Sequence, residues 1–240
     1  MEEKAELERR RKEREEAHLY TSIVVGTNEN FAAYQGFDLF PTSGAYLPEA
    51  EYAPKSYRLL KSTRLGDFNK LVAADLNVDP HFVRLWALVN RQNLTIRPDV
   101  PMTWPTLTIE EAAQKLQSKA PLKLWAEIAK PNAEGQPDWI DVQTIANLQS
   151  PTKPILLFLK HFDAEKQELR GCGHVYIAKQ KKVAELGPLI LERMGWPAGA
   201  NLRLYEVSYT SHPVSTSLIV SRRSKAVSYT HLTLPTIYSV

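Results

Sequence analysis

Apolar residues recur in the same order at two places in the chain, about 118 residues apart. Each copy predicts a strand, then a helix with a single apolar stripe, then another strand. The first copy comprises residues 57–60, 65–76 and 83–86, and the second comprises residues 175–177, 183–194 and 202–205. A solenoid needs at least about three such units to bury a continuous core, so two copies predict two small tandem domains.

Further segments extend the first copy. Alternating apolar residues predict strands over 19–25 and 122–128. A capping-box sequence from Thr108 to Glu111 predicts a short helix that runs from 109 to 116 and stops before a proline. Glycines and prolines interrupt residues 26–54, and prolines recur between 98 and 105, so both stretches predict irregular connections.

The amino terminus and the middle of the chain predict connecting segments. Residues 1–17 are helix formers with almost no apolar side chain, which favours a charged linker helix exposed to solvent. A nucleic-acid-binding arm is the weaker alternative, because acidic residues slightly outnumber basic ones there. Pro151 and Pro154 predict a stiff linker, after which the apolar run 155–159 begins the second domain.

The order of these elements predicts an α+β fold. A strand hairpin, one helix across a face of the sheet and a further strand is the order of the ubiquitin-like β-grasp fold. We therefore expect tandem β-grasp domains preceded by a charged linker helix.

Composition excludes several classes of protein. The hydrophobic fraction of 43% and the charged fraction of 24% are ordinary for a soluble globular chain. No stretch reaches the roughly 18 apolar residues of a membrane helix, and the charged amino terminus does not resemble a signal peptide. One cysteine excludes an internal disulfide, and a net charge of +3 is too small to imply nucleic acid. We expect a soluble cytosolic or nuclear protein without a membrane or nucleic-acid partner.

Candidate chemistry is sparse. Cys172 and His174 are the one close Cys/His pair, but residues two apart on a strand do not readily share a hydrogen bond, so Cys172 is expected to be a small core residue. The basic cluster 179–182 is expected to be a solvated turn rather than a site for an anionic partner. We therefore predict no catalytic residue and no cofactor-binding residue.

Histidines and tryptophans give no further site. The histidines lack the spacing of metal ligands, which predicts no metal site. They are His18, His81, His161, His174, His212 and His231. The tryptophans are expected to pack in cores or domain interfaces. They are Trp86, Trp104, Trp125, Trp139 and Trp196.

Several motifs, in order, resemble the ubiquitin carboxyl-terminal hydrolase 7 family. The sequence Lys-Glu-Arg-Glu-Glu-Ala-His-Leu-Tyr at 12–20 resembles the entry into that family's first ubiquitin-like domain, and Val-Arg-Leu-Trp at 83–86 resembles its third strand. Leu-Leu-Phe-Leu-Lys at 156–160 and Cys-Gly-His-Val-Tyr at 172–176 are similar to the opening hairpin of the second domain. Leu-Arg-Leu-Tyr-Glu at 202–206 matches its third strand.

The resemblance implies a function for the chain. In that family this region binds a herpesvirus immediate-early protein and follows the catalytic domain. The Cys and His boxes of the hydrolase have no counterpart here, and Cys172 falls in a ubiquitin-like domain. The implied parent is a cysteine deubiquitinase of the nucleus and cytoplasm, and the chain would recruit protein partners or support the catalytic domain in cis.

After residue 207 the sequence departs from the family pattern. No acidic residue follows Glu206, and Val-Ser-Tyr-Thr occurs at both 207 and 227. The family's acidic partner-binding turn therefore has no counterpart. We expect residues 208–240 to be a non-native or disordered tail and the second domain to lack its last strand, which would leave two ladder edges open.

The expected organisation has four parts. Residues 1–17 form the linker helix, 18–150 the first ubiquitin-like domain, 151–207 an incomplete second one, and 208–240 the tail. The expected function is a non-catalytic interaction module of a deubiquitinase, with binding surfaces on the sheet faces and in the groove between the domains. The alternatives are a small cysteine hydrolase that uses Cys172 and His174, and a weak nucleic-acid binder.

Overall fold

A computed structural model describes residues 6, 16–36, 38–41, 53–90, 96–118, 121–140, 154–163, 165–178, 181–206 and 217–222. The chain divides into two compact units. Unit 1 comprises Met1–Thr27, Pro54–Val89 and Pro98–Asp138, and unit 2 comprises Asn28–Ala53, Asn90–Arg97 and Trp139–Val240. Because unit 2 includes 28–53 and 139–150, the two units do not coincide with the boundaries expected from sequence.

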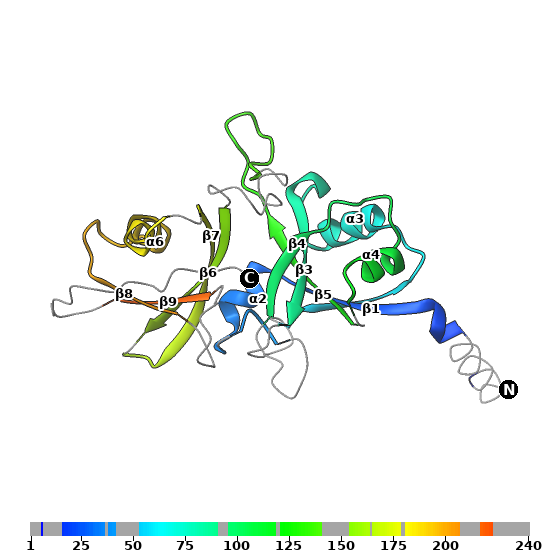
Figure 1. Ribbon diagram of the computed structural model, residues 1–240, viewed down its shortest axis with the longest axis horizontal. Helices are drawn as coiled ribbons and strands as arrows, with labels where there is room; N and C mark the ends of the chain where they lie inside the picture. Colours follow the sequence, from blue (N-terminus) through cyan, green and yellow to red (C-terminus); the bar gives the residue numbers. More distant parts are fainter. Residues whose placement is uncertain are drawn as a thin grey trace. The chain divides into compact units, whose positions relative to one another are not determined.

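Unit 1 contains a five-stranded mixed sheet in the order β2-β1-β5-β3-β4 (Figure 1). Its strands are β1 (Tyr20–Gly26), β2 (Lys55–Leu60), β3 (Val83–Asn90), β4 (Ile96–Pro101) and β5 (Leu122–Ile128). The inner strand β5 is parallel to β1 and antiparallel to β3. The predicted strands at 19–25, 57–60, 83–86 and 122–128 are therefore confirmed.

Strand β4 is a correction to the sequence prediction. The prolines that predict a loop at 98–105 lie partly in this strand, at Pro98 and Pro101. Because β4 is the last strand in the sheet order, one side of it carries no neighbouring strand. Proline lacks an N–H for the ladder and is tolerated at such an edge.

Helices α3 (Leu65–Asp75) and α4 (Ile109–Lys115) cover one face of this sheet. Phe68 and Val72 of α3, one turn apart, are buried in the core of unit 1. Asn77, in the left-handed region at φ 54°, follows the end of α3. The Thr108 side chain and Glu111 form the predicted capping box at the start of α4.

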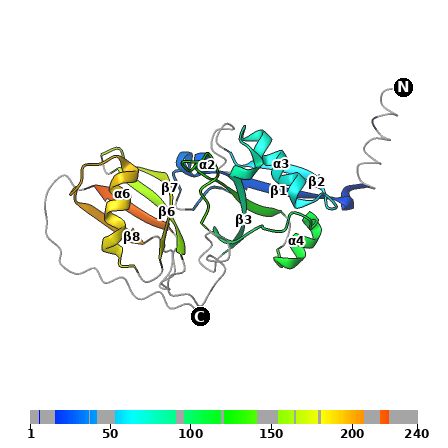
Figure 2. The same cartoon turned by 90° about the horizontal axis from the view of Figure 1, so that it is seen from above.

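Unit 2 contains a four-stranded sheet in the order β7-β6-β9-β8. Its strands are β6 (Pro154–Asp163), β7 (Glu168–Ala178), β8 (Leu202–Glu206) and β9 (Ser217–Arg222). The 3-10 turn η4 (Val183–Glu185) leads into α6 (Leu186–Met194), which crosses one face of the sheet (Figure 2). Gly195, at φ 63°, ends α6. The repeated strand–helix–strand pattern is thus present in both units.

Strand β9 overturns the expectation of a missing last strand. Residues Ser217–Arg222 pair parallel to β6 and antiparallel to β8, so they fill the position that was expected to be empty. The expectation of two open ladder edges is therefore wrong. The rest of 208–240 lies outside the described residues, and its origin stays a prediction.

The connection 26–54 is also more structured than its sequence suggests. It contains α2 (Asn28–Ala33), which packs against β7 (Figure 2). The predicted linker helix and most of the predicted linker near Pro151 lie outside the described residues; Ala17–Leu19 form the 3-10 turn η1. In the described part of the chain, no helix has the length and apolar character needed to cross a membrane.

Candidate functional site

Unit 1 contains a buried polar cluster on the sheet face away from α3. Three N–H groups converge on one carboxylate oxygen, Oε2 of Glu127. Arg84 Nε donates to it at 2.9 Å and Trp86 Nε1 at 2.7 Å, and the Arg84 Nη2 atom lies 2.9 Å away. Arg84 and Glu127 are directly opposite on β3 and β5, and both are buried. The buried charges therefore neutralise one another.

The same face carries large aromatic side chains. Trp86 is opposite Trp125, with ring centroids 6.4 Å apart, and both rings are buried. Strand alternation places Leu85 and Ala87 on the other face, in the core beneath α3. Residues on both faces of these strands are therefore buried at this position.

Unit 2 contains a second buried cation, Lys160 on β6, with no exposed surface. Its Nζ donates to the backbone carbonyl oxygen of Gly36 and lies 3.5 Å from that of Tyr34. The same atom lies 4.8 Å from the centroid of the Phe31 ring and 5.2 Å from that of Tyr34. Burial lowers the pKa of Lys160 to about 8, an effect that the charge of Asp38 partly opposes.

Asp38 fixes the end of the segment that surrounds this lysine. Its Oδ1 accepts hydrogen bonds from the backbone N–H groups of Leu39 at 2.8 Å and Ile96 at 3.0 Å. The neighbouring residues Leu39 and Phe40 are buried. The carboxylate therefore holds backbone from two distant parts of the sequence. Both belong to unit 2, because the first two residues of β4 are grouped with that unit.

Cys172 and His174 contact different neighbours. The Cys172 Sγ atom lies 3.6 Å from the Arg170 carbonyl, whereas the His174 Nδ1 atom lies 3.4 Å from Oδ1 of Asn28. The His174 ring packs against Phe158, with centroids 6.0 Å apart. Burial raises the pKa of the Cys172 thiol, which disfavours the thiolate that a nucleophile requires.

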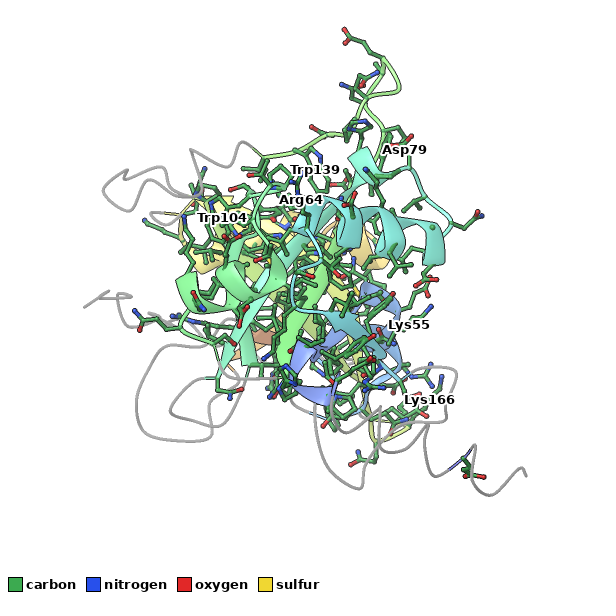
Figure 3. The ribbon with its side chains drawn as sticks, turned by 90° about the vertical axis from the view of Figure 1, so that its right-hand side faces the viewer. Lys55, Arg64, Asp79, Trp104, Trp139 and Lys166 are labelled. Carbon is green, nitrogen blue, oxygen red and sulfur yellow. The ribbon has the colours of Figure 1, made fainter. Side chains whose placement is uncertain are left out.

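The other sequence candidates occupy ordinary structural positions. Among the described residues, no group of three or more His, Cys, Asp or Glu side chains could hold a metal ion. In the basic cluster, Lys181 Nζ pairs with Glu185 at 2.6 Å; residues 179 and 180 lie outside the described part. The ammonium group of Lys115 lies 4.3 Å from the ring centroid of Trp104. Trp104 and Trp139 are labelled in Figure 3. Trp196 packs against His161, and Trp139 is half-buried.

Sequence reasoning missed both buried cations. For Lys160 the available signal is weak: a lysine ends the apolar run 156–159 inside a strand, where an exposed position is the usual expectation. For Arg84 the partner is 43 residues away, so it is identified only once the strand register is known.

The sequence is similar to a short part of several ubiquitin carboxyl-terminal hydrolases. The sequence is 30% identical over 200 residues to ubiquitin carboxyl-terminal hydrolase 5 of Schizosaccharomyces pombe, a match that covers 83% of this chain and 17% of that protein. It is 24% identical over 197 residues to ubiquitin carboxyl-terminal hydrolase 7 of Drosophila melanogaster, covering 82% of this chain and 16% of that protein. The chain thus spans about a sixth of the length of these curated relatives.

A solved structure and a family model complete the comparison. The crystal structure of Kluyveromyces marxianus Atg5 aligns with 84% of this chain and 95% of its own at 10% identity, and the TM-score of 0.27 is too low to support an argument. Residues 83–218 match the model of the ICP0-binding domain of ubiquitin-specific protease 7, which is more than half of the chain. The chain therefore belongs to the family of the ICP0-binding domain of ubiquitin-specific protease 7.

Proposed function

We propose that this chain is a non-catalytic protein-interaction and regulatory module of a ubiquitin-specific cysteine protease. The observation that carries the proposal is the family match over residues 83–218, because the matching domain is named for binding a protein partner. The chain would recruit substrate or regulator proteins, or support the catalytic domain of the same polypeptide. A nuclear and cytoplasmic location is part of this proposal.

The strand orders support two ubiquitin-like β-grasp folds. In each unit an antiparallel hairpin is followed by a helix, and the last strand lies inside the sheet, parallel to the first strand of the hairpin. This arrangement is common to the two strand orders, β2-β1-β5-β3-β4 in unit 1 and β7-β6-β9-β8 in unit 2.

A ubiquitin probe that ends in an electrophile separates this module from a hydrolase. We expect no covalent adduct when the purified chain is incubated with the probe, because the thiol of Cys172 is half-buried and its pKa is raised. The measurement is the mass of the intact chain, with the Cys172→Ala variant as the control. An adduct on the unmodified chain that the variant lacks would establish the cysteine hydrolase instead.

Partner binding is tested directly with an ICP0 fragment, the ligand named for the matching domain. We expect saturable binding to the full chain in isothermal titration calorimetry, with the same affinity for the Cys172→Ala variant. The partner-binding assignment would be contradicted if no binding heat were measured and if the chain did not retain the ICP0 fragment in an independent pull-down.

A further inference from the structure

The sheet of unit 2 has helical structure on both faces. Leu159 packs with Leu186 and Ile190 of α6 in the core of this unit. Phe158 and Lys160 flank Leu159 on β6, so strand alternation places both on the opposite face. That face is covered by α2 and the residues after it, which come from the sequence between the first two strands of unit 1.

The helix α2 approaches the sheet closely. Phe31 has no exposed surface, and its ring meets that of Phe158 edge to face with centroids 5.3 Å apart. The backbone carbonyl of Phe31 lies against Gly171 of β7, where a Cβ atom would overlap the carbonyl oxygen and the Phe31 ring. The approach therefore depends on the absence of a side chain at residue 171.

The residues after α2 close over Lys160. The ammonium group is enclosed by the carbonyls of Tyr34 and Gly36 and by the rings of Phe31 and Tyr34. An ammonium group has three donors and is strongly hydrated in water, so it is buried only where acceptors replace that water. A chain segment that supplies those acceptors is thereby fixed in place.

We propose that Lys160 is a positioning residue that clamps residues 28–41 onto the sheet of unit 2, so that a segment from between the first two strands of unit 1 completes the fold of unit 2. Only Thr27 separates the end of β1 from the start of α2. The two units are then not interchangeable modules, because the fold of unit 2 uses a segment that lies between β1 and β2 in the sequence.

The first test replaces Lys160 with methionine in the full chain. Met is similar in length but has no donor, so the carbonyls of Tyr34 and Gly36 lose the ammonium group and turn toward water. We expect amide hydrogen exchange of the peptides covering 34–41 to become about tenfold faster, with exchange of β5 in unit 1 unchanged. Removing a buried charge offsets part of the loss, so local exchange rather than global stability is the readout.

The matched control is Lys166→Met, in the turn between β6 and β7, where the side chain is exposed and pairs weakly with Asp163 at 3.9 Å. This control should leave exchange of 34–41 at the unmodified rate. Unchanged exchange in Lys160→Met, or an equal increase in both variants, would overturn the role of Lys160.

A second variant disturbs the packing of α2 against β7 without changing the charge of the chain. Gly171→Ala places a methyl group against the Phe31 backbone, so α2 must move away from β7. We expect at least tenfold faster exchange in 28–33 and also in β7, with β5 unchanged, because the sheet then lacks its cover. The adjacent exposed variant Arg170→Ala is the control.

The outcome in β7 decides whether the segment completes the fold. Loss of protection in both 28–33 and β7 supports the proposal. Faster exchange in 28–33 with normal protection in β7 would show that the segment is an accessory and overturn the proposal. Normal protection in both would equally overturn it, since the close approach would then be unnecessary.

Discussion

The two units bury a cation in different ways. In unit 1, Arg84 faces the carboxylate of Glu127 on the neighbouring strand at 2.9 Å. In unit 2, Lys160 donates to neutral backbone carbonyls, and the charge of Asp38 partly opposes the effect of burial on its pKa. A formal opposite charge neutralises the first cation, whereas dipoles only partly replace water around the second. Similar strand orders thus contain sites with different responses to mutation and pH.

The largest expected effect comes from removing the charge that neutralises Arg84. Glu127→Gln keeps the shape and an oxygen for the Trp86 N–H, but it leaves the buried guanidinium without its opposing carboxylate. We expect unit 1 to lose about 3–5 kcal/mol of unfolding free energy, measured by urea denaturation. The exposed pair of Asp67 and Lys70 provides the control, because Asp67→Asn should change little.

A double variant sharpens this result. Combining Glu127→Gln with Arg84→Met removes the buried charge as well as its partner, so part of the lost stability should return. A double variant that is less stable than Glu127→Gln alone would show that packing, and not charge neutralisation, dominates the site.

The next effect is a pH dependence specific to Lys160. Its pKa is lowered from 10.5 to about 8 in the folded state. Between about pH 8 and pH 10.5 the unfolded chain therefore binds more protons than the folded chain. Stability of unit 2 should therefore rise with pH from about 8 to 10.5, by about 3 kcal/mol in total. The measurement is urea denaturation of the unmodified chain and of Lys160→Met over this range; parallel curves would refute the prediction.

The difference between the two curves is needed because other groups titrate nearby. The raised pKa of Cys172 lowers the stability of unit 2 as pH rises above about 9, in opposition to Lys160. In unit 1, burial and then the hydrogen bond to Asp75 raise the pKa of Tyr57, so unit 1 should lose stability above about pH 10. The Tyr57 contribution does not involve Lys160. The charge of Lys160 is one of the influences that lower the pKa of Cys172, so its loss in Lys160→Met raises that pKa further. The Lys160 contribution in unit 2 and the Tyr57 contribution in unit 1 therefore respond to alkaline pH with opposite signs.

The smallest expected effect is on stability and comes from the cap at the start of a helix, which differs between α4 and α6. The Thr108 side chain caps α4 in unit 1, whereas Glu185 before α6 in unit 2 makes no side-chain cap bond. Thr108→Ala should lower the stability of unit 1 by about 1 kcal/mol in thermal denaturation, and Thr108→Ser should retain most of it. Equal losses in the two variants would mean that the hydroxyl oxygen is not the source of the effect.

The sequence by itself determined several of the regular elements. Alternation predicts β1 and β5, and the helical stripes predict α3 and α6, because each pattern depends only on which side of a local element is buried. The capping box at Thr108 is likewise a local signal, since both of its hydrogen bonds connect residues three apart. The family resemblance drawn from these segments is confirmed by the match over 83–218.

Only the tertiary structure decided where three other segments belong. Residues 28–41 are assigned to unit 2 by contacts with β6 and β7, more than 120 residues away in sequence. The prolines of β4 are compatible with a strand because that strand is at an edge, and β9 is a strand because two others lie beside it. The burial of Lys160 also depends on tertiary structure, because its acceptors come from a distant segment. No local sequence pattern predicts which segment will cover that face of the sheet.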